Sequence, residues 1–232
     1  MATTRGQGRK PAAQPSPGQA ERRMSPYETL KRAILSGELA PGQPLVETEL
    51  AAWCEVSRTP IREALLRLEQ DGLIDRSERG LVVRERSPEE ILDVYATRLV
   101  LEATAGRVAA ERRTEHDLRT LRRLVALSAE IDGSDTGAFV AANHKFHRTV
   151  WHASHNESLL DLLERLSLHL GRYPETTLAY PGRWQIARAQ HSQLVDAIEA
   201  RDGDEAYKVA LRHFTDARDI RLLLFDKEDT IE

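Results

Sequence analysis

From Ser87 to its end, this chain of 232 residues shows helical periodicity and no pattern typical of a β-strand. Apolar residues recur three and four positions apart, which places them on one face of an α-helix. The breaks between these segments carry turn-forming residues, as in "DGSD", "SHNES" and "RDGD". The pattern predicts an all-α helical bundle with helices at 88–112, 115–131, 136–154, 157–173, 182–201 and 203–225.

The first part of the chain has a different composition. Residues 1–24 are rich in Pro, Gly, Gln and Ala and hold few large apolar residues, which predicts a disordered tail. Three short helical patterns follow, and Thr59 is expected to cap the third helix with Pro60 at its first position. The stretch "LIDRSERGLVVRE" then predicts a β-hairpin. Three helices and a hairpin indicate a winged helix-turn-helix domain at 25–86, so the predicted fold class is mainly α, with the helical body at 87–232.

The outer side of the third predicted helix carries groups that suit DNA. Arg58, Thr59 and Arg62 lie near its start, where cations and a hydroxyl can contact phosphates and base edges in the major groove. The simpler alternative is that both arginines are solvated charges, paired with Glu63 or Glu69. Helix-turn-helix geometry also serves protein contacts, so the spacing leaves these alternatives open.

The stretch "NHKFH" places polar side chains on an apolar helix face. Asn143 and His147 are four residues apart and share this face. It also carries apolar residues that are expected to point inward, namely Phe139, Val140, Phe146, Val150 and Trp151. His191 and His213 lie on similar apolar faces of later helices. Three imidazoles and an oxygen donor suit Zn²⁺, Ni²⁺ or a similar transition ion, with open positions for another ligand. The alternative is that backbone or water satisfies each histidine separately.

Arg98 is a further polar residue that the helical spacing turns inward. It shares a face with apolar residues of the first helix of the body, including Ile91 and Tyr95. A buried guanidinium needs an anion beside it. Glu102, four residues on, is the simplest partner. A carboxylate ligand held by two parallel hydrogen bonds is the functional alternative. The histidines outside the inward set are expected at the surface or at helix ends.

Both parts of the chain resemble a known family. "PGQPLVETELAAWCEVSRTPIREALLRLEQDGLI" resembles the DNA-binding head of the GntR family of bacterial transcription regulators. "YATRLVLEATAGRVAA", "NHKFHRTVWHASHNESLL" and "HSQLVDAIEARDGDEA" resemble the FCD effector domain of its FadR-like subgroup. The resemblance implies a homodimer whose contacts lie mainly in the body, and a body that binds small organic acids beside a metal.

The resemblance also implies roles for individual residues. It implies DNA contacts in the third helix and at the tip of the wing, by Arg58, Thr59, Arg62, Arg79 and Gly80. It implies a metal site formed by Asn143, His147, His191 and His213, with Arg98 beside the effector. The sequence departs from the family at Asn143, where aspartate is frequent, and at Thr48, where some relatives have an arginine. Glu55 replaces a glycine that is common at the turn between the second and third helices.

The overall function expected is a ligand-responsive, DNA-binding transcriptional regulator. It would sense a small organic acid in a metal-containing pocket and read a two-fold-symmetric double-stranded operator. The lone Cys54 allows no intrachain disulfide, and no apolar run approaches the roughly 20 residues of a membrane span, so a cytoplasmic protein with no membrane partner is expected. The alternatives are a metal-dependent enzyme in a helical bundle and a protein-binding scaffold. No His-Glu-x-x-His, Gly-x-Ser-x-Gly or phosphate-loop motif supports an enzyme.

Overall fold

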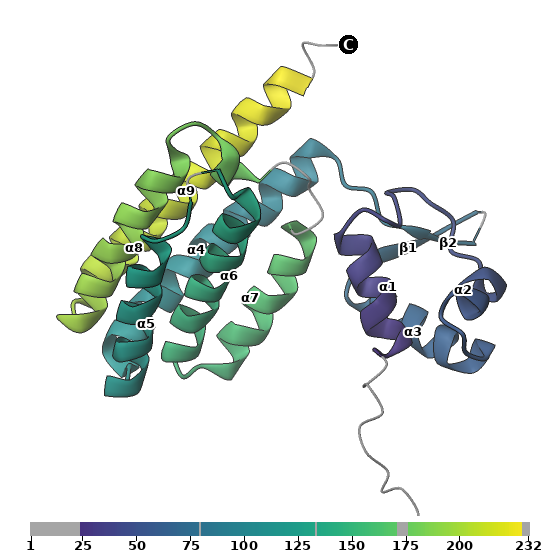
Figure 1. Cartoon of the computed structure of the whole chain (residues 1–232), viewed down its shortest axis with the longest axis horizontal. Helices are drawn as coiled ribbons and strands as arrows, with labels where there is room; N and C mark the ends of the chain where they lie inside the picture. Colours follow the sequence, from purple (N-terminus) through teal and green to yellow (C-terminus); the bar gives the residue numbers. More distant parts are fainter. Residues whose placement is uncertain (1–23, 79, 133, 171–175, 229–232) are drawn as a thin grey trace, which may run out of the picture.

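A small head and a larger helical body lie side by side in the computed structural model, which describes residues 24–78, 80–132, 134–170 and 176–228 (Figure 1). The head holds α1 (Pro26–Leu35), α2 (Glu47–Trp53), α3 (Arg58–Gln70), β1 (Ile74–Ser77) and β2 (Gly80–Val83). The body holds α4 (Pro88–Arg112), α5 (Glu115–Ser128), α6 (Thr136–Ala153), α7 (Glu157–Leu170), the short 3₁₀ helix η1 (Thr177–Ala179), α8 (Arg183–Glu199) and α9 (Gly203–Glu228). The mainly α fold, a winged helix-turn-helix ahead of an all-α bundle, is the predicted one.

The core of the head lies where its three helices meet the hairpin. Leu30 of α1 and Ile61 and Leu68 of α3 are each 0% exposed. These side chains recur at helical spacing, so each helix buries one face against the other two. The two strands pair antiparallel, with Ile74 opposite Val83, and form the wing.

The turn between α2 and α3 explains the family's preference for glycine and corrects one sequence prediction. Glu55 has a φ of 55°, the left-handed conformation that favours the glycine it replaces. Holding a residue with a Cβ there costs on the order of 1 kcal/mol. α3 begins at Arg58 with Ser57 as its N-cap, so the prediction that Thr59 caps the helix is wrong. Pro60 is therefore the third helical residue, where its missing N–H still removes no intrahelical bond.

α4 is the central helix of the body. It packs along α9 and also contacts α6, α7 and α8. Gly106 permits the close approach of α9, because a Cβ at this position would lie 3.1 Å from the backbone oxygen of Ala206. Ser87 and Glu90 form a capping box that starts the helix, as the "SPEE" pattern leads one to expect. α6, α8 and α9, which all contact α4, carry the three buried histidines of the candidate site.

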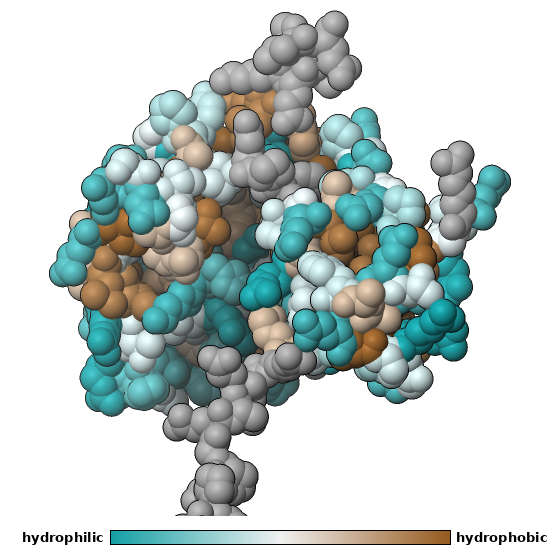
Figure 2. All heavy atoms as spheres, turned by 45° about the vertical axis from the view of Figure 1, so that its right-hand side comes forward, coloured by the Kyte–Doolittle hydropathy of each residue, from teal (hydrophilic) through white to brown (hydrophobic). Residues whose placement is uncertain are grey.

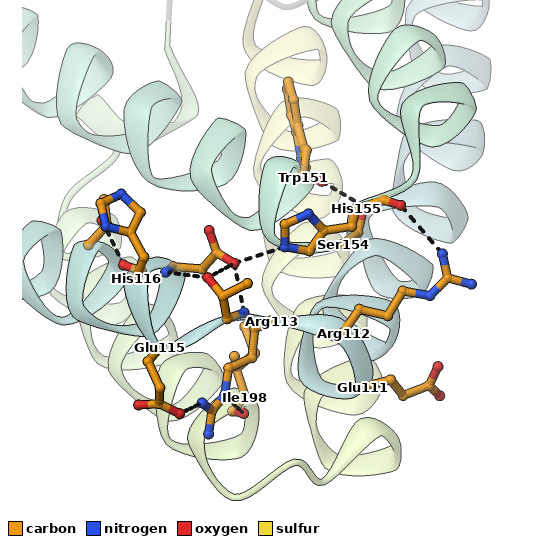
Figure 3. Close-up of polar contacts among 12 residues, drawn as sticks. Glu111, Arg112, Arg113, Glu115, His116, Trp151, Ser154, His155 and Ile198 are labelled. Carbon is orange, nitrogen blue, oxygen red and sulfur yellow. Dashed lines mark hydrogen bonds and ion pairs between the residues drawn. The ribbon is translucent and has the colours of Figure 1, made fainter.

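Arginine side chains close the end of the body where α4 and α8 finish (Figure 3). Arg113 donates from Nε to the carbonyl of Ile198 at 3.4 Å and from Nη2 to that of Glu199 at 3.0 Å. Arg112 donates to the carbonyl of His155 at 3.5 Å. The last carbonyls of a helix lack intrahelical partners, and these guanidinium groups supply them. The polar cluster in Figure 3 is thus a structural cap of the bundle.

Several details of the body differ from the sequence prediction. α5 ends at Ser128 instead of residue 131, and α9 continues to Glu228 instead of 225. η1 was not predicted, because three residues are too few to show a period. Val140 was expected inside but is 41% exposed. The predicted tail up to residue 23 and the predicted helix end at 171–173 lie outside the described residues. Within the described ranges, no helix has the length and apolar character needed to cross a membrane.

The head contacts the body through α7. Leu168 packs against the apolar core of the head. The neighbouring His169 places its Nδ1 3.0 Å from Nη2 of Arg86, in the connection between the lobes. This histidine was expected at the surface or at a helix end, and it lies in the last turn of α7, half-buried at the boundary. Hydrophilic side chains surround the recess between the lobes (Figure 2).

Candidate metal centre and effector cavity

Three histidines from three helices meet in the interior of the body. His147 of α6, His191 of α8 and His213 of α9 are 2%, 3% and 4% exposed. One ring nitrogen of each lies within 4.8 Å of the others. The Nε2 atoms of His147 and His191 are 3.3 Å apart. The structure therefore brings together the three histidines that were predicted from the sequence to converge.

Burial keeps this cluster in its neutral form. Burial, and to a lesser extent the charge of Arg183, lowers the pKa of His191 to about 3. Burial and then the neighbouring imidazoles lower the pKa values of His147 and His213 well below the ordinary value. A neutral imidazole has a lone pair to donate and is the form that binds a metal.

Asn143 lies one turn before His147 on α6. Its Oδ1 is buried and has no hydrogen-bond partner among the described residues. Leaving a buried acceptor unsatisfied costs about 1–3 kcal/mol, so native proteins rarely do so without a reason. A cation next to Oδ1 would remove that cost. The donor set of three imidazoles and one amide oxygen fits a transition ion with N and O ligands.

A polar network fixes the orientation of His213. Its Nδ1 is 2.9 Å from Oε1 of Gln190, and Nε2 of Gln190 donates to Oδ2 of Asp216 at 2.6 Å. An amide oxygen only accepts, so Nδ1 of His213 carries the proton and Nε2 presents its lone pair. Arg183 donates to the same Gln190 oxygen at 3.0 Å and to the carbonyl of His213 at 2.8 Å. Outer partners of this kind orient metal-binding histidines.

Three residues of this network, Arg183, Gln190 and Asp216, were not predicted from the sequence. Arg183 follows Gly182 at the start of α8 and resembles an ordinary first-turn residue, although it is 1% exposed. Gln190 directly precedes His191, and nothing in its sequence neighbourhood marks it as an inward-facing residue. The only usable sequence feature was that Gln190 and Arg183 are seven residues apart, and so lie on one helix face.

A cavity of about 490 Å³ lies beside the histidine cluster. Asn143 and His213 both line it, as do the guanidinium-bearing residues Arg98, Arg183 and Arg221. None of the described residues that line it is acidic. Its wall includes Leu35, the last residue of α1 in the head. Such a lining suits an anionic ligand, because three cationic side chains border the cavity.

Arg98 has both the partner and the position foreseen from the sequence. Its Nε donates to Oε1 of Glu102 at 3.0 Å, and Nε1 of Trp151 donates to the other carboxylate oxygen at 2.7 Å. Burial raises the pKa of Glu102, while Arg98 and Trp151 both favour its charged form. The two Nη groups of Arg98 make no hydrogen bond to the described residues, so they remain available at the cavity wall.

α3 of the head presents the residues that were predicted to contact DNA to solvent. Arg58, Thr59 and Arg62 are all exposed on α3. Nε of Arg62 lies 2.7 Å from Oε2 of Glu47 on α2, so its partner is neither Glu63 nor Glu69. On the wing, Gly80 is exposed with a φ of 109°, whereas Arg79 lies outside the described residues.

The comparisons with known proteins agree with this architecture. Residues 26–83 match the bacterial regulatory proteins of the gntR family, and residues 93–216 match the FCD domain. The chain belongs to the GntR family and carries an FCD domain. It is therefore a ligand-responsive, DNA-binding transcriptional regulator and not an enzyme. FCD domains can bind metals, and the buried histidine triad could hold one.

Individual relatives place the chain among regulators with diverse names. It is 33% identical to a probable D-xylose utilization operon transcriptional repressor of Paenarthrobacter nicotinovorans, over 78% of this chain and 80% of that protein. It is 30% identical to the Nta operon transcriptional regulator of Aminobacter aminovorans, over 77% of this chain and 84% of that protein. The solved structure of E. coli McbR/YncC has the same fold, with a TM-score of 0.71 and 23% identity. The match covers 89% of this chain and 100% of that one.

Proposed function

We propose that this regulator senses a small organic acid at a divalent transition metal held inside its body. The observation that carries the proposal is the unsatisfied Oδ1 of Asn143 beside three neutral, converging histidines. His147, His191 and His213 would hold the ion with Asn143, and the bound ion would supply a positive charge that attracts a carboxylate. Zn²⁺ and Ni²⁺ both suit this donor set.

Arg98 is the proposed second contact to the acid. Glu102, whose other carboxylate oxygen accepts from Trp151, holds the Arg98 guanidinium at the cavity wall while the Nη groups stay available. A guanidinium in a fixed orientation can bind a carboxylate through two parallel hydrogen bonds. An arginine already held by Glu102 loses little side-chain freedom when the ligand arrives, which favours tight binding.

The head is the proposed reader of the operator. Arg58, Thr59 and Arg62 would enter the major groove, and Arg79 and Gly80 would approach the minor groove at the wing tip. Reading a two-fold-symmetric site requires two copies of the head. Exposed apolar side chains on the body, such as Val100 of α4 and Leu223 of α9, are 52% and 47% exposed and would support a homodimer. The proposed division is a tail at 1–24, a DNA-binding domain at 25–86 and an effector and dimer domain at 87–232.

Two measurements on the full chain test this function. Elemental analysis of protein purified without chelators or a metal-affinity column should find close to one Zn²⁺ or Ni²⁺ per chain. A mobility-shift assay on a symmetric operator should then respond to a carboxylate only when the metal is present. A metal content below about one tenth of an equivalent, with no uptake of added Zn²⁺ or Ni²⁺, would remove the metal from the proposal. Sedimentation as a monomer at micromolar concentration would contradict the dimer.

A further inference from the structure

Hydroxyl groups from three different elements line the cavity beside the histidine cluster. They belong to Tyr95 of α4, Ser167 of α7 and Thr177 of η1. Tyr95 and Thr177 are only 8% and 9% exposed, and Oγ of Ser167 is buried. None of these three hydroxyl groups makes a hydrogen bond to another described residue. Each is therefore a donor and an acceptor that the described part of the protein leaves without a partner.

Hydroxyl groups elsewhere in the body are engaged with the backbone of their own helix. Thr104, Thr149 and Thr215 each donate from Oγ1 to the carbonyl four residues earlier, at 2.8 Å. This bond is the usual way for a helical hydroxyl to be satisfied. Ser167 lies inside α7 and makes no such bond to the described residues. Its hydroxyl is thus left for whatever occupies the cavity.

The arginines of the cavity wall leave little free positive charge away from Arg98. Arg98 has Nη groups that make no hydrogen bond to the described residues. Arg183 donates to Gln190 and to the carbonyl of His213. Arg221 is likewise engaged within the protein. The described lining therefore offers a guanidinium at Arg98 for one carboxylate, and neutral hydroxyls for the rest of a ligand.

The hydroxyls decide what kind of remainder a ligand can have. Buried hydroxyls without a protein partner are satisfied by water in a free protein. A ligand that is apolar beyond its carboxylate would displace this water without replacing its hydrogen bonds, which lowers its affinity. A ligand hydroxyl both donates and accepts, so it can replace a water molecule. The volume of about 490 Å³, within the roughly 300–1,000 Å³ of ligand cavities, has space for such groups.

We propose that the effector is a polyhydroxylated carboxylic acid, of the chemical class of the sugar acids. Its carboxylate binds at the metal and Arg98, and its hydroxyls bind Tyr95, Ser167 and Thr177. Tyr95 is three residues before Arg98 and lies on the same face of α4, so one molecule can contact both. The site of the carboxylate rests on the proposed function, whereas the hydroxylated remainder rests on the lining of the cavity.

Calorimetric titration of full-length, Zn²⁺-loaded protein with gluconate, α-hydroxyhexanoate and adipate tests the inference. The three acids have the same number of carbon atoms. α-Hydroxyhexanoate shares the carboxylate and the neighbouring hydroxyl of gluconate, so it can chelate Zn²⁺ in the same way and lacks only the further hydroxyls. Adipate has a second carboxylate in their place. Gluconate is expected to bind roughly ten- to a hundredfold more tightly than either, as two or three neutral hydrogen bonds provide.

Three variants assign this preference to the cavity wall. Tyr95→Phe, Ser167→Ala and Thr177→Val each remove one hydroxyl with little change in shape. Each should weaken gluconate binding about two- to tenfold, the effect of one neutral hydrogen bond, and leave α-hydroxyhexanoate affinity and zinc content unchanged.

A fourth variant controls for the loss of a hydroxyl as such. Tyr207→Phe removes the same group from α9 outside the cavity lining, where the ring lies 4.7 Å from the guanidinium carbon of Arg107. It should keep the wild-type affinity for all three acids.

The outcomes separate the inference from the proposed function. If α-hydroxyhexanoate or adipate binds as tightly as gluconate, the polyhydroxylated effector is overturned and the metal-bound acid stands. The same conclusion follows if the three cavity variants bind gluconate as tightly as Tyr207→Phe does. Failure of all three acids to bind the Zn²⁺-loaded protein overturns both proposals.

Discussion

Nε2 of His147 and Nε2 of His191 face each other at 3.3 Å in the interior of the body. Two lone pairs at this separation repel unless a proton or a cation lies between them. A proton on one ring resolves the contact in the metal-free protein, and a transition ion would resolve it when bound. Together with the unsatisfied oxygen of Asn143, this contact supports the proposal that the cluster binds a cation.

Variants of the cluster should change metal content in opposite directions. His147→Ala removes one of the converging imidazoles, so most of the metal should be lost. Asn143→Asp places a full negative charge beside the ion and should tighten binding. Elemental analysis and competition with a metal indicator measure both effects. The exposed His152→Ala provides a matched control that should retain wild-type metal content.

The metal-free protein should lose stability as the pH falls. An unfolded imidazole has a pKa near 6.5, whereas that of His191 in the folded state is about 3. Between these values the unfolded chain binds a proton that the folded chain excludes, so the free energy of unfolding decreases as pH drops below about 6.5. For this residue alone the loss is on the order of 3 kcal/mol by about pH 4. Urea unfolding across this range measures it.

A matched pair of variants tests the origin of that pH dependence. His191→Gln removes the buried titrating group and should flatten the decline in the free energy of unfolding. His152→Gln changes an exposed histidine and should leave the decline as it is in the wild type. Identical slopes in all three proteins would contradict the assignment to the buried cluster.

DNA binding should depend on the exposed face of α3. Arg58→Ala and Arg62→Ala should each weaken operator binding by roughly 1–3 kcal/mol and relax specificity at one base position. Affinity should also fall steeply with salt, because phosphate contacts release counterions. Arg123→Ala, an exposed change on α5, is the control and should bind like the wild type. Wild-type affinity in both α3 variants would place the operator contacts elsewhere.

The histidine cluster could be predicted because each histidine interrupts an apolar face of a periodic helix. His147, His191 and His213 needed no knowledge of how α6, α8 and α9 pack. Gln190 and Arg183 escaped prediction because their roles depend on where α9 lies beside α8, which no local pattern encodes. Leu35 escaped for the same reason, since its place in the cavity wall follows from how the head packs against α7.

Helix ends were predictable where side chains set them and less so elsewhere. Ser87 and Glu90 form the capping box that starts α4, and this motif is visible in the sequence. The sequence predicts too late an end for α5, because no glycine or proline before Gly133 marks where the helix stops. The true start of α3 at Arg58 follows from the backbone of Glu55, whose positive φ turns the chain.

The pair formed by Arg98 and Glu102 allows the effector contact to be tested without disrupting the core. Arg98→Ala alone leaves the buried Glu102 carboxylate without its cation, and breaking a buried pair in this way costs about 3–5 kcal/mol of stability. Replacing both partners, as in Arg98→Met with Glu102→Gln, avoids an uncompensated charge and should preserve the fold. The double variant should keep its metal but bind adipate roughly ten- to a hundredfold more weakly than the wild type. Glu102→Gln alone keeps the guanidinium and an oxygen that can accept from its Nε, so its adipate affinity should exceed that of the double variant. Calorimetry on the Zn²⁺-loaded proteins makes the comparison, and equal adipate affinity in the double variant and the wild type would exclude Arg98 from the effector site.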